Sequence, residues 1–166
     1  MKKRLLFLVV PVFFLVACSM SNTPTSKAEE LFSKYQTLDN EIDSEITMIL
    51  NEQNLTESQK ERYRKILEKQ YKNLTYQIKD EKIDGDTALV TAEIEVLDLK
   101  HAIDNLLFDS SIYTKQTYDE EKLSRLESVK NKVKYTLELT VEKDDNGNWH
   151  LNNLTNDKIK KIQGMY

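Results

Sequence analysis

The pattern of apolar positions after residue 26 predicts one long helix. From Ala28 to Leu50, apolar residues recur every three or four positions, so they fall on one face of a helix. Ser26 and Glu29 have the spacing of a capping box, in which each side chain bonds the backbone N–H of the other residue. The polar residues between the apolar positions are expected to face water.

Four further segments have helical features but are shorter. The first of these segments follows a second capping box, and the second follows a strand-like segment. The third and the fourth each follow a residue of a type that often caps helices. The segment 110–118 is expected to contain a break. We expect helices at Tyr63–Tyr71 after Thr56 and Gln59, at Leu99–Phe108, at Leu123–Val129 after Asp119, and at Ile159–Ile162 between Thr155 and Gly164.

Apolar and polar residues alternate in four other segments, which is the pattern of strands with one buried face. A turn over 83–86 separates the first two segments, and a turn over 145–148 separates the last two. In the second turn, Asn146-Gly147 favours the positive φ angles of a type I′ hairpin. The expected strands are Leu74–Lys79, Ala88–Leu97, Val133–Glu142 and Trp149–Leu151.

This order of elements predicts an α+β domain in which an antiparallel sheet packs against the N-terminal helices. A helical insert, residues 99–131, separates the two hairpins. The segments 85–90 (Gly-Asp-Thr-Ala-Leu-Val), 147–151 (Gly-Asn-Trp-His-Leu) and 164–166 (Gly-Met-Tyr) resemble small uncharacterised bacterial lipoproteins. Those proteins have the cone-like fold of nuclear transport factor 2 and its cystatin-like relatives. The resemblance therefore implies a cone-like fold of this kind.

The first eighteen residues resemble a bacterial lipoprotein signal peptide. Residues 2–4 are basic, residues 5–16 are apolar, and Leu15-Val16-Ala17-Cys18 matches the lipobox. A membrane-spanning helix needs about 20 apolar residues, so this shorter run indicates an export signal. The resemblance implies that diacylglycerol is attached to the sulfur of Cys18 and that the chain is cut before this residue. The alternative is an ordinary secretory signal with a cysteine at the cleavage site by chance.

The lipobox predicts where the protein is found and how the chain is divided. Residues 1–17 would be the signal peptide, 18–25 the lipidated cysteine and a polar tether, and 26–166 a single domain. The protein would lie outside the cytoplasm, held to the cell membrane by the lipid on Cys18. Because Cys18 is the one cysteine in the chain, the domain has to be stable without a disulfide.

The charge of the chain narrows the range of partners. The whole chain has 24 Lys and Arg against 28 Asp and Glu. Removal of the signal peptide leaves 21 against 28, a net charge of −7. This acidic balance argues against binding to nucleic acid or to anionic lipid headgroups.

The sequence contains few candidates for catalysis or metal binding. His101 and His150 are far apart in the sequence, and the alternation around Trp149 points His150 to solvent. The segment 142–147 superficially matches the start of a calcium loop, but predicted strands flank it and a turn is the better interpretation. We therefore assign no catalytic residue, no metal and no cofactor.

Four aromatic residues are the remaining candidates for a site. Tyr35, Tyr76, Tyr135 and Trp149 fall on predicted inward faces. They line a ligand-binding cleft if the cone is open, and otherwise they fill the core. We favour a non-catalytic module that binds a protein, a peptide or a small ligand; the alternative is a small enzyme or ligand-sequestering protein that uses the interior of the cone.

Overall fold

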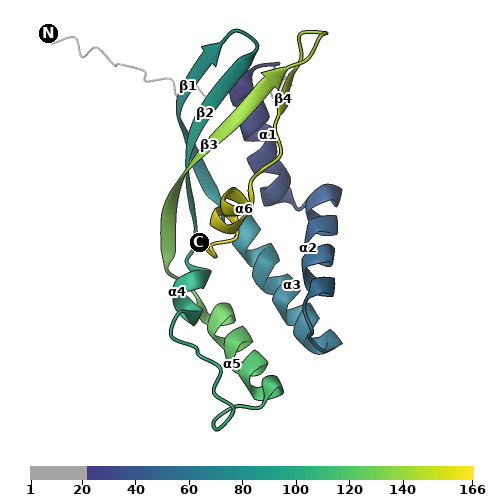
Figure 1. Ribbon diagram of the computed structural model, residues 1–166, viewed down its shortest axis with the longest axis vertical. Helices are drawn as coiled ribbons and strands as arrows, with labels where there is room; N and C mark the ends of the chain where they lie inside the picture. Colours follow the sequence, from purple (N-terminus) through teal and green to yellow (C-terminus); the bar gives the residue numbers. More distant parts are fainter. Residues whose placement is uncertain (1–21) are drawn as a thin grey trace, which may run out of the picture.

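The sheet at the centre of the fold has four antiparallel strands in the order β1-β2-β3-β4. The computed structural model describes residues 22–166, so Cys18 and the predicted signal peptide lie outside the described residues. The fold is α+β, as predicted (Figure 1). In chain order, the elements are α1 (Pro24–Thr37), α2 (Asn40–Glu52), α3 (Glu57–Lys72), β1 (Thr75–Asp84), β2 (Thr87–Leu97), α4 (Leu99–Ile103), α5 (Lys115–Ser128), β3 (Lys132–Lys143), β4 (Trp149–Leu151) and α6 (Asn156–Ile162).

The alternation of β2 gives the sheet one apolar and one charged face. Residues 88, 90, 92, 94 and 96 of β2 are buried, while the residues between them are partly exposed. On the exposed face, Glu93 lies 3.0 Å from Lys134 of β3 and 3.5 Å from Lys79 of β1. Such cross-strand pairs of opposite charge stabilise a sheet modestly and help fix its register. The predicted strand patterns are thus confirmed, although β1 is longer than expected.

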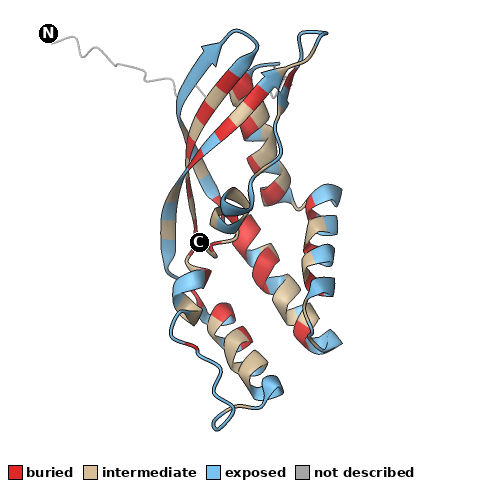
Figure 2. Ribbon diagram, viewed as in Figure 1, coloured by how far each residue is buried: buried red, intermediate tan, exposed pale blue. Residues whose placement is uncertain are grey.

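Helix α1 lies across the apolar face and contacts all four strands (Figures 1 and 2). Its buried side chains Phe32 and Tyr35 belong to the main core together with residues from β2 and β3. Helices α2 and α3 pack beside α1 and close this core. The apolar area removed from water here stabilises the fold at roughly 25 cal/mol per Å².

A second, smaller core extends the molecule beyond one end of the sheet. Helix α3 reaches past the sheet and packs against α5, which also contacts α4 (Figure 1). The molecule is therefore elongated, with both hairpin turns at one end and α4 and α5 at the other. The buried residues of this second core are Ile66, Leu97, Leu99, Leu123, Leu126 and Val129.

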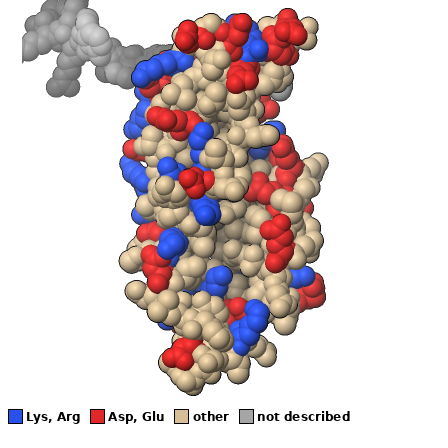
Figure 3. Space-filling model, viewed as in Figure 1, with Lys and Arg blue, Asp and Glu red and all other residues tan. Residues whose placement is uncertain are grey.

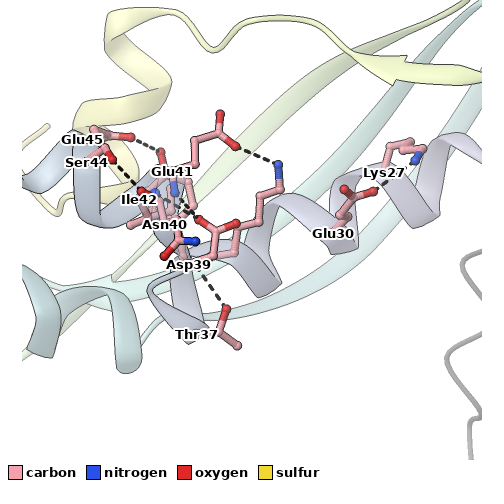
Figure 4. A network of polar contacts seen from close by, with 11 residues as sticks. Lys27, Glu30, Thr37, Asp39, Asn40, Glu41, Ile42, Ser44 and Glu45 are labelled. Atoms are coloured by element: carbon pink, nitrogen blue, oxygen red, sulfur yellow. Dashed lines mark hydrogen bonds and ion pairs between the residues drawn. The ribbon is translucent and has the colours of Figure 1, made fainter.

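The prediction of a single long N-terminal helix is wrong, because the chain turns at Leu38. This residue has a left-handed φ of 53°, and α1 ends there. Asp39 then caps α2 by accepting from the N–H groups of Glu41 and Ile42 at 3.1 and 3.0 Å (Figure 4). The Asp39 cap satisfies N–H groups that a continuous helix would bond internally.

Three other predicted helix boundaries also need correction. The capping box of α1 is formed by Thr23 and Ser26, so the helix begins at Pro24, within the predicted tether. Helix α5 is capped by Thr114, while Asp119 lies inside it and pairs with Lys115 at 2.7 Å. Helix α4 stops at Ile103, well before residue 108. The Thr56–Gln59 capping box and the Thr155 cap are confirmed.

The turn between β3 and β4 differs from the predicted type I′ geometry. Gly147 has a φ of 81°, but Asn146 does not have a positive φ. The Asp144 side chain accepts from the N–H groups of Asn146 and Asn148, each at 2.9 Å. These bonds organise a longer turn in which glycine alone takes the left-handed conformation.

Candidate functional site

The loop between α4 and α5, residues 104–114, carries three exposed large apolar side chains; we call it the apolar loop. The exposed fractions are 77% for Leu107, 54% for Phe108 and 70% for Ile112. Scattered single apolar residues are ordinary on protein surfaces, whereas three of them in one short loop make this loop the candidate interaction site. The apolar loop is the end of the molecule farthest from the hairpin turns (Figure 1).

Tyr118 of α5 holds the apolar loop in place. Its ring makes edge-to-face contacts with Phe108 and Tyr113, with centroid distances of 5.4 and 5.9 Å. Its hydroxyl donates to the carbonyl oxygen of Leu106 at 3.1 Å. An ordered loop loses less conformational entropy when a partner binds, so it is better suited to recognition than a disordered one.

A turn at Asp109 orders the outer part of the apolar loop. The Asp109 carboxylate accepts from the N–H and the hydroxyl of Ser111 at 2.8 and 2.7 Å. These hydrogen bonds hold the pKa of Asp109 below its ordinary value. The backbone N–H of Tyr113 also donates to the Asp109 carbonyl oxygen at 2.8 Å. Leu107 and Ile112 are thus presented on either side of a defined turn.

A shallow depression of about 350 Å³ adjoins the start of α5. It lies between the connection from α2 to α3 and the first turns of α5, and its walls include Leu55, Lys115 and Asp119. The walls are of mixed polarity, and the ion pair between Lys115 and Asp119 crosses one of them. The apolar loop ends at the start of α5, beside this depression, but Leu107, Phe108 and Ile112 do not line it.

The four aromatic residues predicted to line a cleft lie in four separate settings. Tyr35 contacts Tyr71 edge to face at 4.9 Å, and Tyr76 stacks on Phe32 at 4.6 Å. The Tyr135 hydroxyl donates to the carbonyl oxygen of Tyr166 at 3.1 Å, and Trp149 lies beneath the Lys143 ammonium at 4.6 Å. Trp149 faces inward as predicted, with 6% of its surface exposed. Each of the four packs against its own partners in or beside the main core.

A partly buried carboxylate lies beside one of these residues. Glu45 of α2 accepts from the Tyr35 hydroxyl at 3.3 Å, and its other oxygen, Oε1, is buried without a hydrogen-bond partner among residues 22–166. Burial raises the pKa of Glu45, and the bond from Tyr35 opposes this rise. Burial is the largest cause that raises the pKa of the Tyr35 hydroxyl, and the negative charge of the nearby Glu45 raises it further. The network therefore couples the packing of α1 and α2 to the ionisation of Glu45.

The two histidines are at opposite ends of the sheet. His101 is in α4, beside a shallow depression of about 260 Å³ that Asp98 and Lys130 also line. His150 is in β4, is exposed as predicted, and lies 2.9 Å from the Asp144 carboxylate. The backbone bond from Asn148 and then the contact with His150 lower the pKa of Asp144 to about 2. Asp144 is therefore a turn-forming carboxylate.

The N-terminal end of the described chain is bound to the hairpin end of the sheet. The Asn22 side chain donates to the Gly147 carbonyl oxygen at 2.9 Å and accepts from the Trp149 N–H at 2.8 Å. The Glu81 carboxylate of β1 accepts from the N–H and hydroxyl of Thr25 at 2.8 and 2.7 Å. We call these four hydrogen bonds the N-terminal clamp. It ties residues 22–25 to both edges of the sheet.

Sequence reasoning missed both the apolar loop and the N-terminal clamp. The apolar residues of segment 103–108 predict one stripe of a helix, whereas the structure exposes Leu107 and Phe108 in a loop. The one available signal is that the apolar run is followed at once by Asp109, Ser110 and Ser111, which favour turns over helix. The clamp joins residues that are 56 to 127 positions apart, so no local pattern encodes it.

Comparisons with known proteins give no match to this chain. No protein-family model matches it, and no curated protein or solved structure is significantly similar to it. Within residues 22–166, His, Cys, Asp and Glu form no group of three or more that could hold a metal ion. In the same part of the chain, the helices are too short or too polar to cross a membrane.

Proposed function

We propose that this protein is an extracytoplasmic lipoprotein, anchored to the cell membrane through lipid on Cys18, that works as a non-catalytic interaction module. Support for the anchor comes from the basic start, the apolar run and the lipobox match at Leu15–Cys18. Two acyl chains on one residue are enough for stable membrane attachment, whereas one chain gives only marginal binding.

The ordered apolar loop is the observation that carries the interaction role. Leu107, Phe108 and Ile112 expose more than half of their surface, although Tyr118 and Asp109 hold the loop in a defined conformation. Keeping large apolar side chains in water is unfavourable, so a conformation that does so is best explained by a partner that covers them. The partner class that this surface fits is a protein with an apolar groove.

We also propose that the fold is a member of the nuclear transport factor 2-like class, with the segment from α4 to α5 as its helical insert. The arrangement of α1 across a four-stranded antiparallel sheet supports this assignment. The interior between α1 and the sheet is filled by residues such as Phe32, Ile94 and Leu139, each no more than 1% exposed. The apolar loop, outside this interior, is therefore our preferred contact surface.

Metabolic labelling tests the anchor. Cells that express the protein or its Cys18→Ala variant are grown with a palmitate analogue, and the membranes are separated from the soluble fraction. We expect label and membrane retention for the unmodified protein and loss of both for the variant. Equal label and retention in the two would refute lipid attachment at Cys18.

Site-specific crosslinking tests the interaction surface. A photoreactive amino acid is placed at Leu107 in intact cells and, as a control of comparable exposure, at Met48 on α2, which is 58% exposed. We expect a discrete adduct from position 107 that disappears when Ile112 is replaced by Ser. The same adduct from both positions, or its persistence in Ile112→Ser, would contradict a role for the apolar loop.

A further inference from the structure

The N-terminal clamp leaves very little chain between the folded domain and the predicted lipid. Three residues, 19–21, separate Cys18 from Asn22. Four Cα–Cα steps of about 3.8 Å cannot exceed about 15 Å in any conformation. The Cα atom of Cys18, whose side chain would carry the lipid, therefore lies within that distance of the Asn22 Cα atom, and the lipid is attached near the β3–β4 turn to which Asn22 is bonded.

The clamp fixes the place at which the chain leaves the domain because it has two points of attachment. Asn22 is bonded to the β3–β4 turn and to β4 at one edge of the sheet, and Thr25 is bonded to β1 at the other edge. Pro24, between them, is buried. A chain bonded at a single point could pivot, whereas these contacts hold residues 22–25 across the width of the sheet.

We propose that the clamp makes the anchored protein stand upright, with both hairpin turns toward the bilayer and the apolar loop away from it. This inference rests on the proposed attachment of lipid to Cys18. The strand β3 has 12 residues, and the steps between them, of roughly 3.3 Å each, span about 36 Å. The helices α4 and α5 and the apolar loop lie beyond the end of that strand farthest from the turns (Figure 1). In this orientation, the partner binds the apolar loop at a distance from the lipid headgroups.

The charges of the hairpin end support an upright domain that is not adsorbed to lipid. The two turns contain Asp84, Asp86, Asp144 and Asp145, and Lys82 and Lys143 are the nearby cations in sequence. Figure 3 shows several acidic side chains at this end of the molecule, with basic side chains beside them. Anionic headgroups repel these carboxylates within a Debye length of about 8–10 Å. The short tether holds the hairpin end near the surface, while this repulsion keeps the hairpin end itself from adsorbing to the headgroups.

Fluorescence quenching on vesicles tests the orientation. The full-length lipidated protein is prepared with Asn146→Cys in the β3–β4 turn or with Ser111→Cys in the apolar loop; both sites are exposed. Lipid occupies the sulfur of Cys18, so each variant has one free thiol for a dye. The proteins are added to vesicles of phosphatidylcholine and anionic phosphatidylglycerol, with and without a headgroup quencher. We expect the dye at position 146 to lose most of its emission and the dye at position 111 to keep it.

The outcomes separate this inference from the proposed anchor. Retention on the vesicles with equal quenching at both positions, or with stronger quenching at 111, overturns the upright orientation and leaves the lipid anchor intact. A protein that does not stay with the vesicles overturns both.

Two further variants test the clamp itself. Asn22→Ala should reduce quenching at position 146, whereas Asn152→Ala, an exposed asparagine bonded to Glu142 and outside the clamp, should not. Ten Gly and Ser residues inserted after Ser21 add an average reach of about 18 Å and should also reduce it. Unchanged quenching in both Asn22→Ala and the insertion would show that the clamp and the short tether do not set the orientation.

Discussion

The side-chain amide of Gln70 bonds both backbone polar groups of Leu97. Its Oε1 accepts from the Leu97 N–H at 3.0 Å, and its Nε2 donates to the Leu97 carbonyl oxygen at 3.2 Å. Strand β1 pairs with β2 only as far as Glu95, so Leu97 lies beyond the end of β1. Gln70, which is fully buried, therefore supplies the hydrogen bonds that no strand provides there. The same Nε2 donates to Ile162 and thereby joins α6 to this point.

Replacement of Gln70 by Met should lower the free energy of unfolding by about 2–4 kcal/mol. Met has a similar volume but cannot bond Leu97, and each buried polar group left unpaired costs about 1–3 kcal/mol. Urea unfolding measures the change. Gln116→Met on the exposed face of α5 is the matched control and should change stability by less than about 0.5 kcal/mol. Similar losses of stability in the two variants would show that the hydrogen bonds of Gln70 do not determine the free energy of unfolding.

Gly164→Ala should be more harmful than the same change at Gly85. Both residues have a left-handed backbone, with φ of 67° and 59°, so both changes cost about 1–2 kcal/mol from conformation alone. A Cβ on Gly164 would lie 2.0 Å from the Leu97 carbonyl oxygen, whereas one on Gly85 meets nothing within 4 Å. We expect an additional loss of about 1–3 kcal/mol at Gly164, the usual cost of overpacking. Thermal unfolding of the two variants side by side gives the difference, and equal losses would contradict the steric argument.

The ionisation of Glu45 should make the protein less stable as the pH rises. Its pKa is raised in the folded state because of burial, so the folded protein holds this proton more tightly than the unfolded chain does. The stability that protonated Glu45 contributes is fully present below the unfolded pKa of about 4.3, and it is lost as the pH rises through the higher folded pKa. The free energy of unfolding of Glu45→Gln should therefore increase relative to that of the unmodified protein over this interval.

Tyr35→Phe provides the opposite test of the same network. It removes the hydroxyl that bonds the Glu45 carboxylate, so the pKa of Glu45 should rise further and the loss of stability with pH should become steeper. Urea unfolding at a series of pH values compares the three proteins. Parallel profiles for all three would show that the environment of Glu45 does not affect folding.

The sheet could be predicted because its residues encode a single buried face. In β2, the alternation from Ala88 to Leu97 leaves one register that buries the apolar side chains, and the structure has that register. Helix α3 could be predicted for a related reason: Thr56 and Gln59 are adjacent on one turn and need no distant partner. Both signals are local, so the sequence alone was enough to locate them.

The break after α1 and the exposure of the apolar loop depend on contacts that no local pattern describes. The apolar spacing continues through Leu38 in phase with α2, and only Asp39 indicates a new start. The exposure of Leu107 depends on how Tyr118, eleven positions later, holds the loop. Periodicity predicts which side chains share a face, but it does not show whether another element covers that face.

Tyr118 should control the function of the apolar loop without being part of the contact surface. Tyr118→Ala removes the ring beside Phe108 and Tyr113 and the bond to Leu106, while Leu107 and Ile112 remain in the chain. The loop should then lose its defined conformation, and a partner would have to order it on binding. Hydrogen exchange of residues 104–114 should become faster, and the crosslink from position 107 should weaken. Tyr118→Phe retains the ring and loses only the hydroxyl, so it should have a smaller effect on both measurements. If Tyr118→Ala speeds exchange in the loop but leaves the crosslink unchanged, the apolar side chains act without the fixed conformation.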